Sequence, residues 1–195
     1  MRVIRADEYC CMPWKNGGGE TTEIAAHPGS AGLDGFDWRV SMARVARSGP
    51  FSSFDGCDRT LAILEGAGLR LTIAGRHPIE LTTRSEPLSF PADLPTTATL
   101  ADGPVLDLNV MTRRDVFEHA LDRLTIVGDR SLSIDGSTAL LLCRSGSIGV
   151  EIGGAMAELK MGETLLVQPA ASGRWNLRAE PKAVVFVVRI RPIRR

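Results

Sequence analysis

Two segments of this chain repeat one pattern of residues, and the repeat limits the fold more than any other feature of the sequence. Residues 61–92 and 140–170 align with a gap of one residue. Both copies alternate apolar and polar residues, as half-buried strands do, and place glycines at turns. Unrelated amphipathic hairpins would also alternate, but matching Gly and Pro positions favour duplication of one small β unit. The matched residues are Leu69, Leu71 and Ile73 with Ile148, Val150 and Ile152, Gly75 with Gly154, and Pro91-Ala92 with Pro169-Ala170.

The frequency of turn-forming residues supports an all-β interpretation. The 195 residues include 20 Gly and 11 Pro, which would interrupt long helices repeatedly. Hydrophobic residues make up 44% of the chain and charged residues 24%, as in folded globular proteins. Only residues 113–124 show a helical pattern, an apolar stripe that includes Phe117 and Leu121. We expect an all-β chain in which one short helix links domains at residues 1–112 and 113–195.

Charge and hydropathy exclude two classes of partner. Lys and Arg number 23 and Asp and Glu number 23, whereas a nucleic-acid partner calls for a basic excess. No apolar run reaches the length of a membrane span, and the first residues lack the apolar core of a signal peptide. We therefore expect a cytoplasmic protein with no nucleic-acid and no membrane partner.

The four cysteines have no metal-binding spacing, so free thiols are their simplest state in a reducing compartment. They are Cys10, Cys11, Cys57 and Cys143. A redox role for the adjacent pair Cys10 and Cys11 is the alternative to plain packing.

A glycine-rich segment, PWKNGGGETTEI at residues 13–24, is the first candidate for ligand binding. Three successive glycines let the backbone approach a ligand closely or present N–H donors to an anion, and the preceding Lys and Asn add side-chain donors. The Lys precedes the glycines, so the segment is no Walker A loop. The Trp and the strand-like TTEI favour an ordered loop over a flexible one. The candidates in this segment are Trp14, Lys15, Asn16, Gly17, Gly18 and Glu23.

Three further segments contribute polar candidates. Residues 36–45, FDWRVSMARV, alternate strictly, so one face of the expected strand is apolar and the other polar. In residues 107–111, DLNVM, the Asp and the Asn share a face in the same way. The segment GPFSSFDGCDRT at residues 49–60 carries an arginine near its end. The candidates from these segments are Arg39, Ser41, Arg59, Asp107 and Asn109.

The strand, glycine turn and strand of each repeat resemble the small β-barrel of the cupin family. Two copies imply an RmlC-like bicupin, with two small jelly-roll barrels in one compact chain. Metal-binding cupins present an HxH pair, a glutamate and a later histidine. Here the glutamate position, counted back from Gly66, holds Arg59, and no imidazole falls at the other positions. His27, His77 and His119 also share no metal-ligand spacing. The resemblance therefore implies no metal and no cofactor, and Arg59 offers a guanidinium fork suited to a carboxylate or phosphate.

Four motifs together resemble the HutD (Ves) family. They are PWKNGGGETTEI, FDWRVSMARV, GPFSSFDGCDR and GPVLDLNVMTRR, within residues 13–114. The family consists of bicupin proteins associated in bacteria with histidine-utilisation genes. It has no established reaction and is usually described as accessory or regulatory. The resemblance thus implies a fold and a metabolic neighbourhood, and leaves the activity open.

The leading hypothesis is a metal-free protein that binds a small anionic metabolite of histidine breakdown and has an accessory or regulatory role. Urocanate or a formyl- or formimino-glutamate represents the expected ligand class. Part of the site would hold the carboxylate and part the other polar end of the ligand. The first group is Lys15, Arg39 and Arg59, and the second is Glu23, Ser41, Asp107 and Asn109.

Other functions stay open at this point. The same polar residues could form a satisfied ion-pair network inside a narrow barrel. A metal-independent isomerase or epimerase is the enzyme alternative, with Lys15 and either Glu23 or Asp107 as an acid–base pair. The sequence shows no activated nucleophile that would name a catalytic residue. A scaffold would need an exposed apolar patch, and a homodimer is as compatible with the sequence as a monomer.

Overall fold

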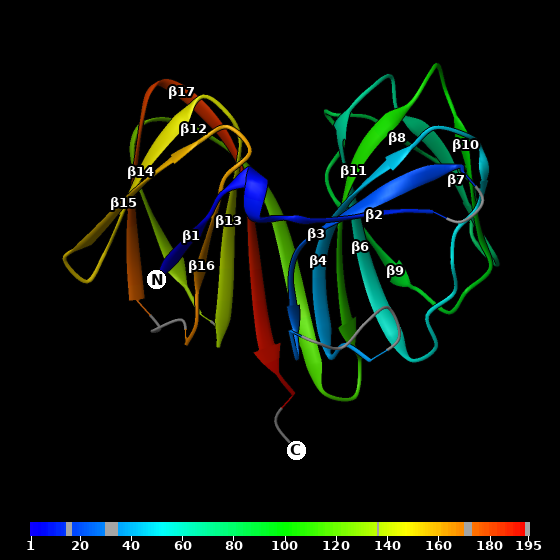
Figure 1. Ribbon diagram of the computed structural model, residues 1–195, viewed down its shortest axis with the longest axis horizontal. Coiled ribbons are helices and arrows are strands. Elements are labelled where there is room, and N and C mark those ends of the chain that lie inside the picture. The colour runs from blue at the N-terminus through cyan, green and yellow to red at the C-terminus, as the bar shows by residue number, and fades with distance from the viewer. Residues whose placement is uncertain (15–16, 30–34, 136, 170–172, 194–195) are drawn as a thin grey trace. The chain divides into compact units, whose positions relative to one another are not determined.

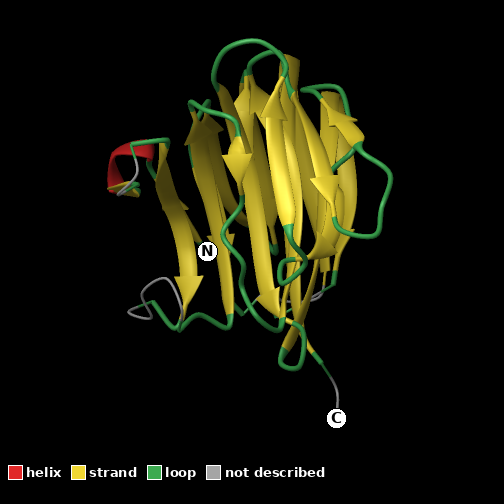
Figure 2. Ribbon diagram, turned by 90° about the vertical axis from the view of Figure 1, so that its right-hand side faces the viewer, coloured by secondary structure: helices red, strands yellow, loops and turns green. Residues whose placement is uncertain are grey.

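Strands make up almost all of the regular structure in the computed structural model of the chain (Figures 1 and 2). The structure describes residues 1–14, 17–29, 35–135, 137–169 and 173–193. Within these ranges the only helix is the single 3-10 turn η1 (Ala6–Glu8). The all-β prediction is confirmed.

The predicted helix over residues 113–124 is wrong. A short turn follows Arg113, and strand β12 (Phe117–Ile134) then begins. β12 pairs with β17 (Gly173–Pro192), which supplies backbone partners along the strand. A twelve-residue apolar stripe contributes little helical stability by itself, so this strand pairing decides the local structure.

The chain divides into two compact units. The first unit is Cys10–Glu118, and the second unit joins Met1–Tyr9 to His119–Arg195. This division differs from the expected 1–112 and 113–195, chiefly because the first nine residues belong to the second unit. There β1 (Arg2–Ile4) pairs antiparallel with β16 (Thr164–Val167). The Tyr9 hydroxyl lies 2.7 Å from both the Gly162 carbonyl oxygen and the Thr164 hydroxyl.

The first unit contains two antiparallel sheets with apolar side chains between them. In β7, residues LRLTI alternate strictly between buried and exposed positions, as a strand with one covered face requires. The inward residues Leu69, Leu71 and Ile73 of β7 form one cluster with Leu61 and Ile63 of β6 in the other sheet. The six-stranded sheet runs β2 (Cys10–Pro13), β3 (Gly19–His27), β4 (Trp38–Val45), β11 (Val105–Arg113), β6 (Cys57–Glu65) and β9 (Leu88–Pro91), and the four-stranded sheet runs β5 (Gly49–Pro50), β10 (Thr96–Leu100), β7 (Leu69–Ile73) and β8 (Ile79–Leu81).

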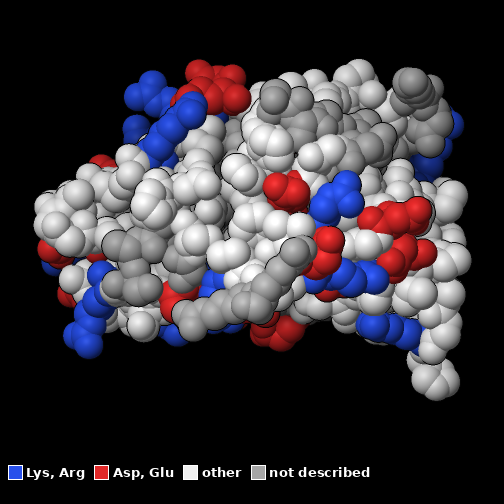
Figure 3. All heavy atoms as spheres, turned by 90° about the horizontal axis from the view of Figure 1, so that it is seen from below, with Lys and Arg blue, Asp and Glu red and all other residues white. Residues whose placement is uncertain are grey.

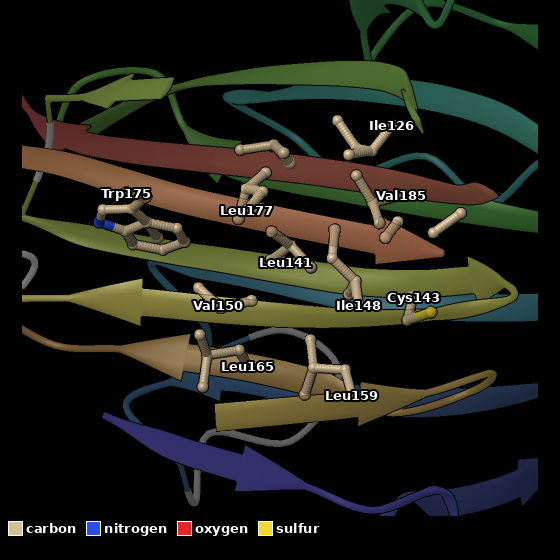
Figure 4. Packing of buried hydrophobic residues seen from close by; sticks show 14 of the residues in the cluster. Ile126, Leu141, Cys143, Ile148, Val150, Leu159, Leu165, Trp175, Leu177 and Val185 are labelled. Carbon is tan, nitrogen blue, oxygen red and sulfur yellow. The ribbon is translucent and has the colours of Figure 1, made fainter. Parts of the chain in front are cut away.

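The second unit is one seven-stranded sheet organised around β17. The first half of β17 pairs with β14 (Ser147–Ile152), and its second half pairs with β13 (Thr138–Ser145). β15 (Ala155–Lys160) pairs with β14, and β16 pairs with β13. The buried cluster of this unit is apolar, with Leu141, Leu165 and Leu177 pointing toward one another and Trp175 at one end (Figure 4).

Strand pairing repeats between the two units where the sequence repeats. β6 pairs with β11 and β9, and β13 pairs likewise with β17 and β16. β7 pairs with β10 and β8, and β14 pairs likewise with β17 and β15. The turns after β6 and β13 each need a glycine. A Cβ on Gly66 (φ +93°) would lie 2.5 Å from the Pro104 oxygen, and one on Gly146 (φ +75°) 2.3 Å from the Lys182 oxygen.

Charges of both signs are intermixed on the face of the molecule drawn in Figure 3. This distribution fits a chain with equal numbers of acidic and basic residues. Across the described ranges, no helix has the length and hydropathy to cross a membrane.

Candidate ligand site in the first unit

Three neighbouring strands bring five predicted site residues to one face of the six-stranded sheet. In the antiparallel register, Met111 of β11 lies opposite both Arg39 of β4 and Arg59 of β6. Asn109 is two residues away on β11, opposite Ser41 of β4. Because side chains alternate along a strand, all of these residues point to the same side of the sheet.

Asp107 continues this face along β11, and the face is the inner one. Asp107 lies opposite Ala43 of β4 and Ile63 of β6, both of which belong to the apolar cluster between the sheets. The polar residues are therefore inside the unit, and all five are buried. We call Arg39, Ser41, Arg59, Asp107 and Asn109 the polar layer.

Arg59 is surrounded by aromatic rings. Its side chain is 5% exposed, and its guanidinium carbon lies 5.2 Å from the ring centre of Phe51, 5.3 Å from that of Phe54 and 5.9 Å from that of Phe90. Nη2 donates to the Ser52 carbonyl at 3.3 Å, whereas the buried Nε has no hydrogen-bond partner in the described part of the chain. Burial lowers the Arg59 pKa to about 10, so the group stays charged at neutral pH. We call these three rings the phenylalanine cage.

The guanidinium of Arg39 forms an ion pair through one of its nitrogens. Its Nε donates to Glu23 Oε2 at 2.7 Å, and the Glu23 side chain is 24% exposed. β3 brings Glu23 opposite Ser41 next to an irregularity in the pairing with β4. Arg39 Nη2 is buried and has no partner. Of the alternative ion-pair network, only the Arg39–Glu23 pair is present among the described residues, where Arg59 makes no ion pair.

Asp107 is the most deeply buried ionisable side chain of the polar layer, at 1% exposure. Its Oδ1 accepts a hydrogen bond from Asn109 Nδ2 at 2.5 Å, and its Oδ2 has no partner. Burial raises the Asp107 pKa to about 7, although the Arg59 charge and hydrogen bonds from Asn109 and the Ala43 backbone act in the opposite direction. Near neutral pH this carboxyl is present in both its protonated and its ionised forms.

Three polar atoms of the layer therefore have no partner among the described residues: Arg39 Nη2, Arg59 Nε and Asp107 Oδ2. Buried polar groups in proteins nearly always have a hydrogen-bond partner, and an unpartnered one costs about 1–3 kcal/mol. The two guanidinium nitrogens are donors, and the carboxyl oxygen accepts or donates according to its protonation. The layer thus presents two unpartnered donors and one carboxyl oxygen on the same face of the sheet.

The described part of the glycine-rich segment is ordered by packing and hydrogen bonds. Trp14 Nε1 donates to Thr21 Oγ1 at 2.8 Å, and the Trp14 ring packs against the apolar cluster of the first unit. The Gly17 N–H donates to the Trp14 carbonyl at 3.0 Å. A Cβ on Gly19 would lie 2.2 Å from the Arg44 carbonyl oxygen and 3.1 Å from the Trp14 ring. An ordered loop is therefore the correct interpretation for this part, and Gly19 allows the close packing.

The remaining candidates of that segment have different positions. The Gly18 carbonyl accepts a hydrogen bond from the Ala46 N–H at 3.0 Å, and Gly18 is buried. Lys15 and Asn16 lie outside the described residues, so their predicted roles stay predictions.

The phenylalanine cage is the part of the site that sequence reasoning missed. Phe51 and Phe54 belong to the motif GPFSSFDGCDR, from which only Arg59 was predicted as a site residue. Cation–π contacts follow from three-dimensional placement, and the cage draws its rings from a loop and from β9, far apart in the sequence. The one available signal was the proximity of two phenylalanines to an arginine in a single motif.

Histidines and cysteines of the described residues form no cluster of three or more potential metal ligands, alone or with carboxylates. His27 stacks against Trp38, with ring centres 6.0 Å apart. Cys10 and Cys11 are exposed free thiols, and Cys11 Sγ lies 3.6 Å from Glu20 Oε2. The expected absence of a bound metal stays a prediction.

Two surface hollows belong to the second unit. Their volumes are about 390 and 480 Å³, and both include Met156 and Arg178 in their lining. They are open to solvent, and Arg178 is engaged at the surface with Glu180 at 2.6 Å. The buried polar layer and these two hollows thus lie in different units. We place the candidate site at the polar layer, because its charges are desolvated and partly unpartnered.

By its fold the protein belongs to a broad class, that of all-β proteins with a cupin-like fold. A cupin 2 conserved barrel domain protein from Leptotrichia buccalis superimposes with a TM-score of 0.60 over 97% of this chain and 96% of its own, at 10% identity. An identity this low shows the fold alone.

The chain belongs to the HutD family, since the HutD family model matches residues 6–187. The uncharacterised 21.2 kDa protein in the hutC 3′ region of Pseudomonas putida is 34% identical over 154 residues, which cover 79% of each chain. Protein Ves of Citrobacter koseri is 43% identical over 105 residues, or 52% of each chain. The predicted membership of the HutD (Ves) family is confirmed, and the relatives' names link the family to a histidine-utilisation locus.

Two solved structures of higher identity share the fold. A conserved protein of unknown function from Pseudomonas aeruginosa PAO1 is 35% identical, with a TM-score of 0.91 over 97% of this chain and 98% of its own. The structure of HutD from Pseudomonas fluorescens SBW25 in a formate condition is 29% identical in sequence, with a TM-score of 0.84 over 99% of both chains.

Proposed function

We propose that the first unit binds a small carboxylate metabolite at the polar layer, and that the protein is a metal-free accessory or regulatory factor of histidine degradation in the cytoplasm. One observation carries the proposal. Arg59 is a buried, charged guanidinium whose Nε has no partner and which makes no ion pair within the described residues. Burying such a charge is costly unless a counter-charge offsets it, and a carboxylate fits the guanidinium fork.

The surroundings of Arg59 support a small organic acid. Arg39 Nη2 is a second unpartnered donor on the same face, and the phenylalanine cage offers flat apolar contacts to the carbon skeleton of a ligand. Asp107, Asn109 and Ser41 would fix the other polar end. The names of the relatives favour urocanate or a formyl- or formimino-glutamate as the ligand class.

We also propose the finer description of the fold, a bicupin made of two small jelly-roll barrels. The equivalent pairings of β6, β7 and β9 with those of β13, β14 and β16 support it. The buried cluster of the second unit is apolar, and its described residues include no buried charged side chain. Ligand binding is therefore assigned to the first unit, and the second unit has a structural role.

Thermal unfolding and calorimetric titration with formate, urocanate and N-formyl-glutamate test the function. At least one of these compounds should raise the melting temperature of the wild type by mass action and be recovered chemically intact. Arg59→Lys should weaken this effect. The matched control Arg70→Lys alters an arginine that is exposed and paired with Glu80, and it should leave binding unchanged. Equal binding by wild type and Arg59→Ala would refute the proposed site.

An acid–base enzyme of the isomerase or epimerase type is the second candidate, and one observation favours it. Burial raises the Asp107 pKa to about 7, which suits proton transfer at neutral pH. Proton NMR in deuterated water would reveal exchange or isomerisation of the same compounds. Turnover that Asp107→Asn abolishes would favour the enzyme over the binding protein.

A further inference from the structure

The charges of the polar layer do not cancel when Asp107 is protonated. Arg39 is paired with Glu23 at 2.7 Å, so these two charges offset each other. Among the described residues Arg59 has no carboxylate in contact, although the charge of Asp107 is close enough to influence its pKa. With Asp107 neutral, the layer carries one uncompensated positive charge. With Asp107 ionised, it carries none.

Within the described residues, the charged groups that face Asp107 are Arg39, Arg59 and Glu23, and no further charge lies around it. On β11 its neighbour on the same face is Asn109, whose amide donates to Oδ1. β4 contributes Ala43 and Arg39, β3 contributes Glu23, and β6 contributes Ile63, Arg59 and the buried thiol of Cys57. The opposite sheet contributes the apolar side chains Leu69, Leu71, Ile73, Leu81 and Ala98.

An anion bound at Arg59 would therefore lie near Asp107 Oδ2. If Asp107 is ionised, the two negative charges repel each other, because the buried surroundings screen charge poorly. Protonation removes this repulsion and turns Oδ2–H into a donor. We propose that the polar layer accepts ligands with a single negative charge and that Asp107 takes up one proton as such a ligand binds. This inference rests on the proposed function and specifies its ligand class.

The same reasoning excludes a dianion. A second carboxylate at the far end of a ligand would lie among Asp107, Asn109 and apolar side chains, where no arginine remains to offset it. A neutral amide or ring N–H at that end can instead donate to a carbonyl or carboxyl oxygen. The preferred ligand is thus a monocarboxylate whose other end is polar and uncharged. Within the proposed ligand class this favours urocanate over N-formyl-glutamate, which carries two carboxylates.

Succinate and succinamate form a matched pair of probes, because they differ only in one terminal carboxylate replaced by an amide. Calorimetric titration of the wild type at pH 6.5, 7.5 and 8.5, with formate as a third probe, measures the preference. Succinamate should bind at least about tenfold more tightly than succinate at pH 7.5. Its affinity should fall by up to about tenfold per pH unit above pH 7, because the proton must be supplied at each binding event.

Proton uptake gives a second measurement that needs no variant. Titrations in two buffers of different ionisation enthalpy count the protons, and the count for succinamate should approach one near pH 8. Asp107→Asn keeps the shape of the side chain but cannot titrate. It should abolish the uptake and flatten the pH profile while retaining the preference for succinamate. Glu80→Gln, an exposed carboxylate of the same unit, is the control and should behave as wild type.

The outcomes separate this inference from the proposed function. Comparable affinities for succinate and succinamate, or binding with no proton uptake and a flat pH profile in the wild type, would overturn the inference while leaving carboxylate binding intact. If none of the three probes, urocanate and N-formyl-glutamate binds the wild type at millimolar concentration at any of the three pH values, the proposed function fails and the inference fails with it.

Discussion

Replacing Asp107 by Asn should change the pH dependence of stability in a direction that the structure fixes. The Asp107 side chain is 1% exposed, and burial raises its pKa from 3.8 to about 7. In the folded state the carboxyl therefore keeps its proton to a higher pH than in the unfolded chain. Its stabilising effect is fully present below pH 4 and is lost as the pH rises from about 4 to about 7.

The size of the effect follows from the shift. About three pKa units at about 1.4 kcal/mol each correspond to about 4 kcal/mol, an upper estimate for a group this deeply buried. Asn is nearly isosteric, and its side-chain oxygen can still accept from Asn109. The free energy of unfolding of Asp107→Asn, relative to that of wild type, should therefore increase by up to about 4 kcal/mol between pH 4 and pH 8.

Urea unfolding at constant ionic strength measures this difference at each pH. Both proteins should carry Trp175→Phe, so that the fluorescence comes only from Trp14 and Trp38 of the first unit. Comparing the two proteins at the same pH cancels all other titrating groups. A difference that stays constant within about 1 kcal/mol from pH 4 to pH 8, or that grows toward acid pH, would refute the buried-carboxyl argument.

Three further predictions concern the polar layer and the glycine-rich segment. Calorimetry should show that Arg59→Ala weakens carboxylate binding by about 2–5 kcal/mol, while the stability of the apo protein stays similar or improves. If the variant melted far below wild type yet bound normally, Arg59 would be structural. Elemental analysis should find no stoichiometric transition metal, and chelator should not change the melting temperature; about one iron, manganese or zinc per chain would contradict this. Gly19→Ala should destabilise the first unit by about 1–3 kcal/mol, since its Cβ would lie 2.2 Å from the Arg44 carbonyl. Gly17→Ala meets no neighbour within 4 Å and should cost only about 1 kcal/mol of strain at φ +64°, so equal melting temperatures of the two variants would contradict the packing argument.

Sequence alternation located the polar layer because it reports directly on the faces of strands. In FDWRVSMARV and DLNVM the two-residue period separates polar from apolar positions, and neighbouring strands then align these faces. Arg59 followed from its position relative to Gly66 in a repeated turn. Alternation together with the cupin resemblance could therefore assign five residues from three separate segments to one face of a sheet.

The features that the sequence did not reveal depend on contacts between distant segments. The stripe that contains Phe117 and Leu121 fits a helical pattern over a dozen residues, yet the segment forms β12, which pairs with β17. β1 carries no local sign that it belongs beside β16. The phenylalanine cage likewise depends on where Phe51, Phe54 and Phe90 meet.

The pairing of β1 with β16 can form only late in translation. A ribosome makes Arg2–Ile4 before any other strand of the fold, but the partner, Thr164–Val167, emerges about 160 residues later. The first unit, Cys10–Glu118, can complete its own sheets during this interval. Until Thr164–Val167 has been made, β1 therefore lacks its partner strand, and only then can it close one edge of the second unit.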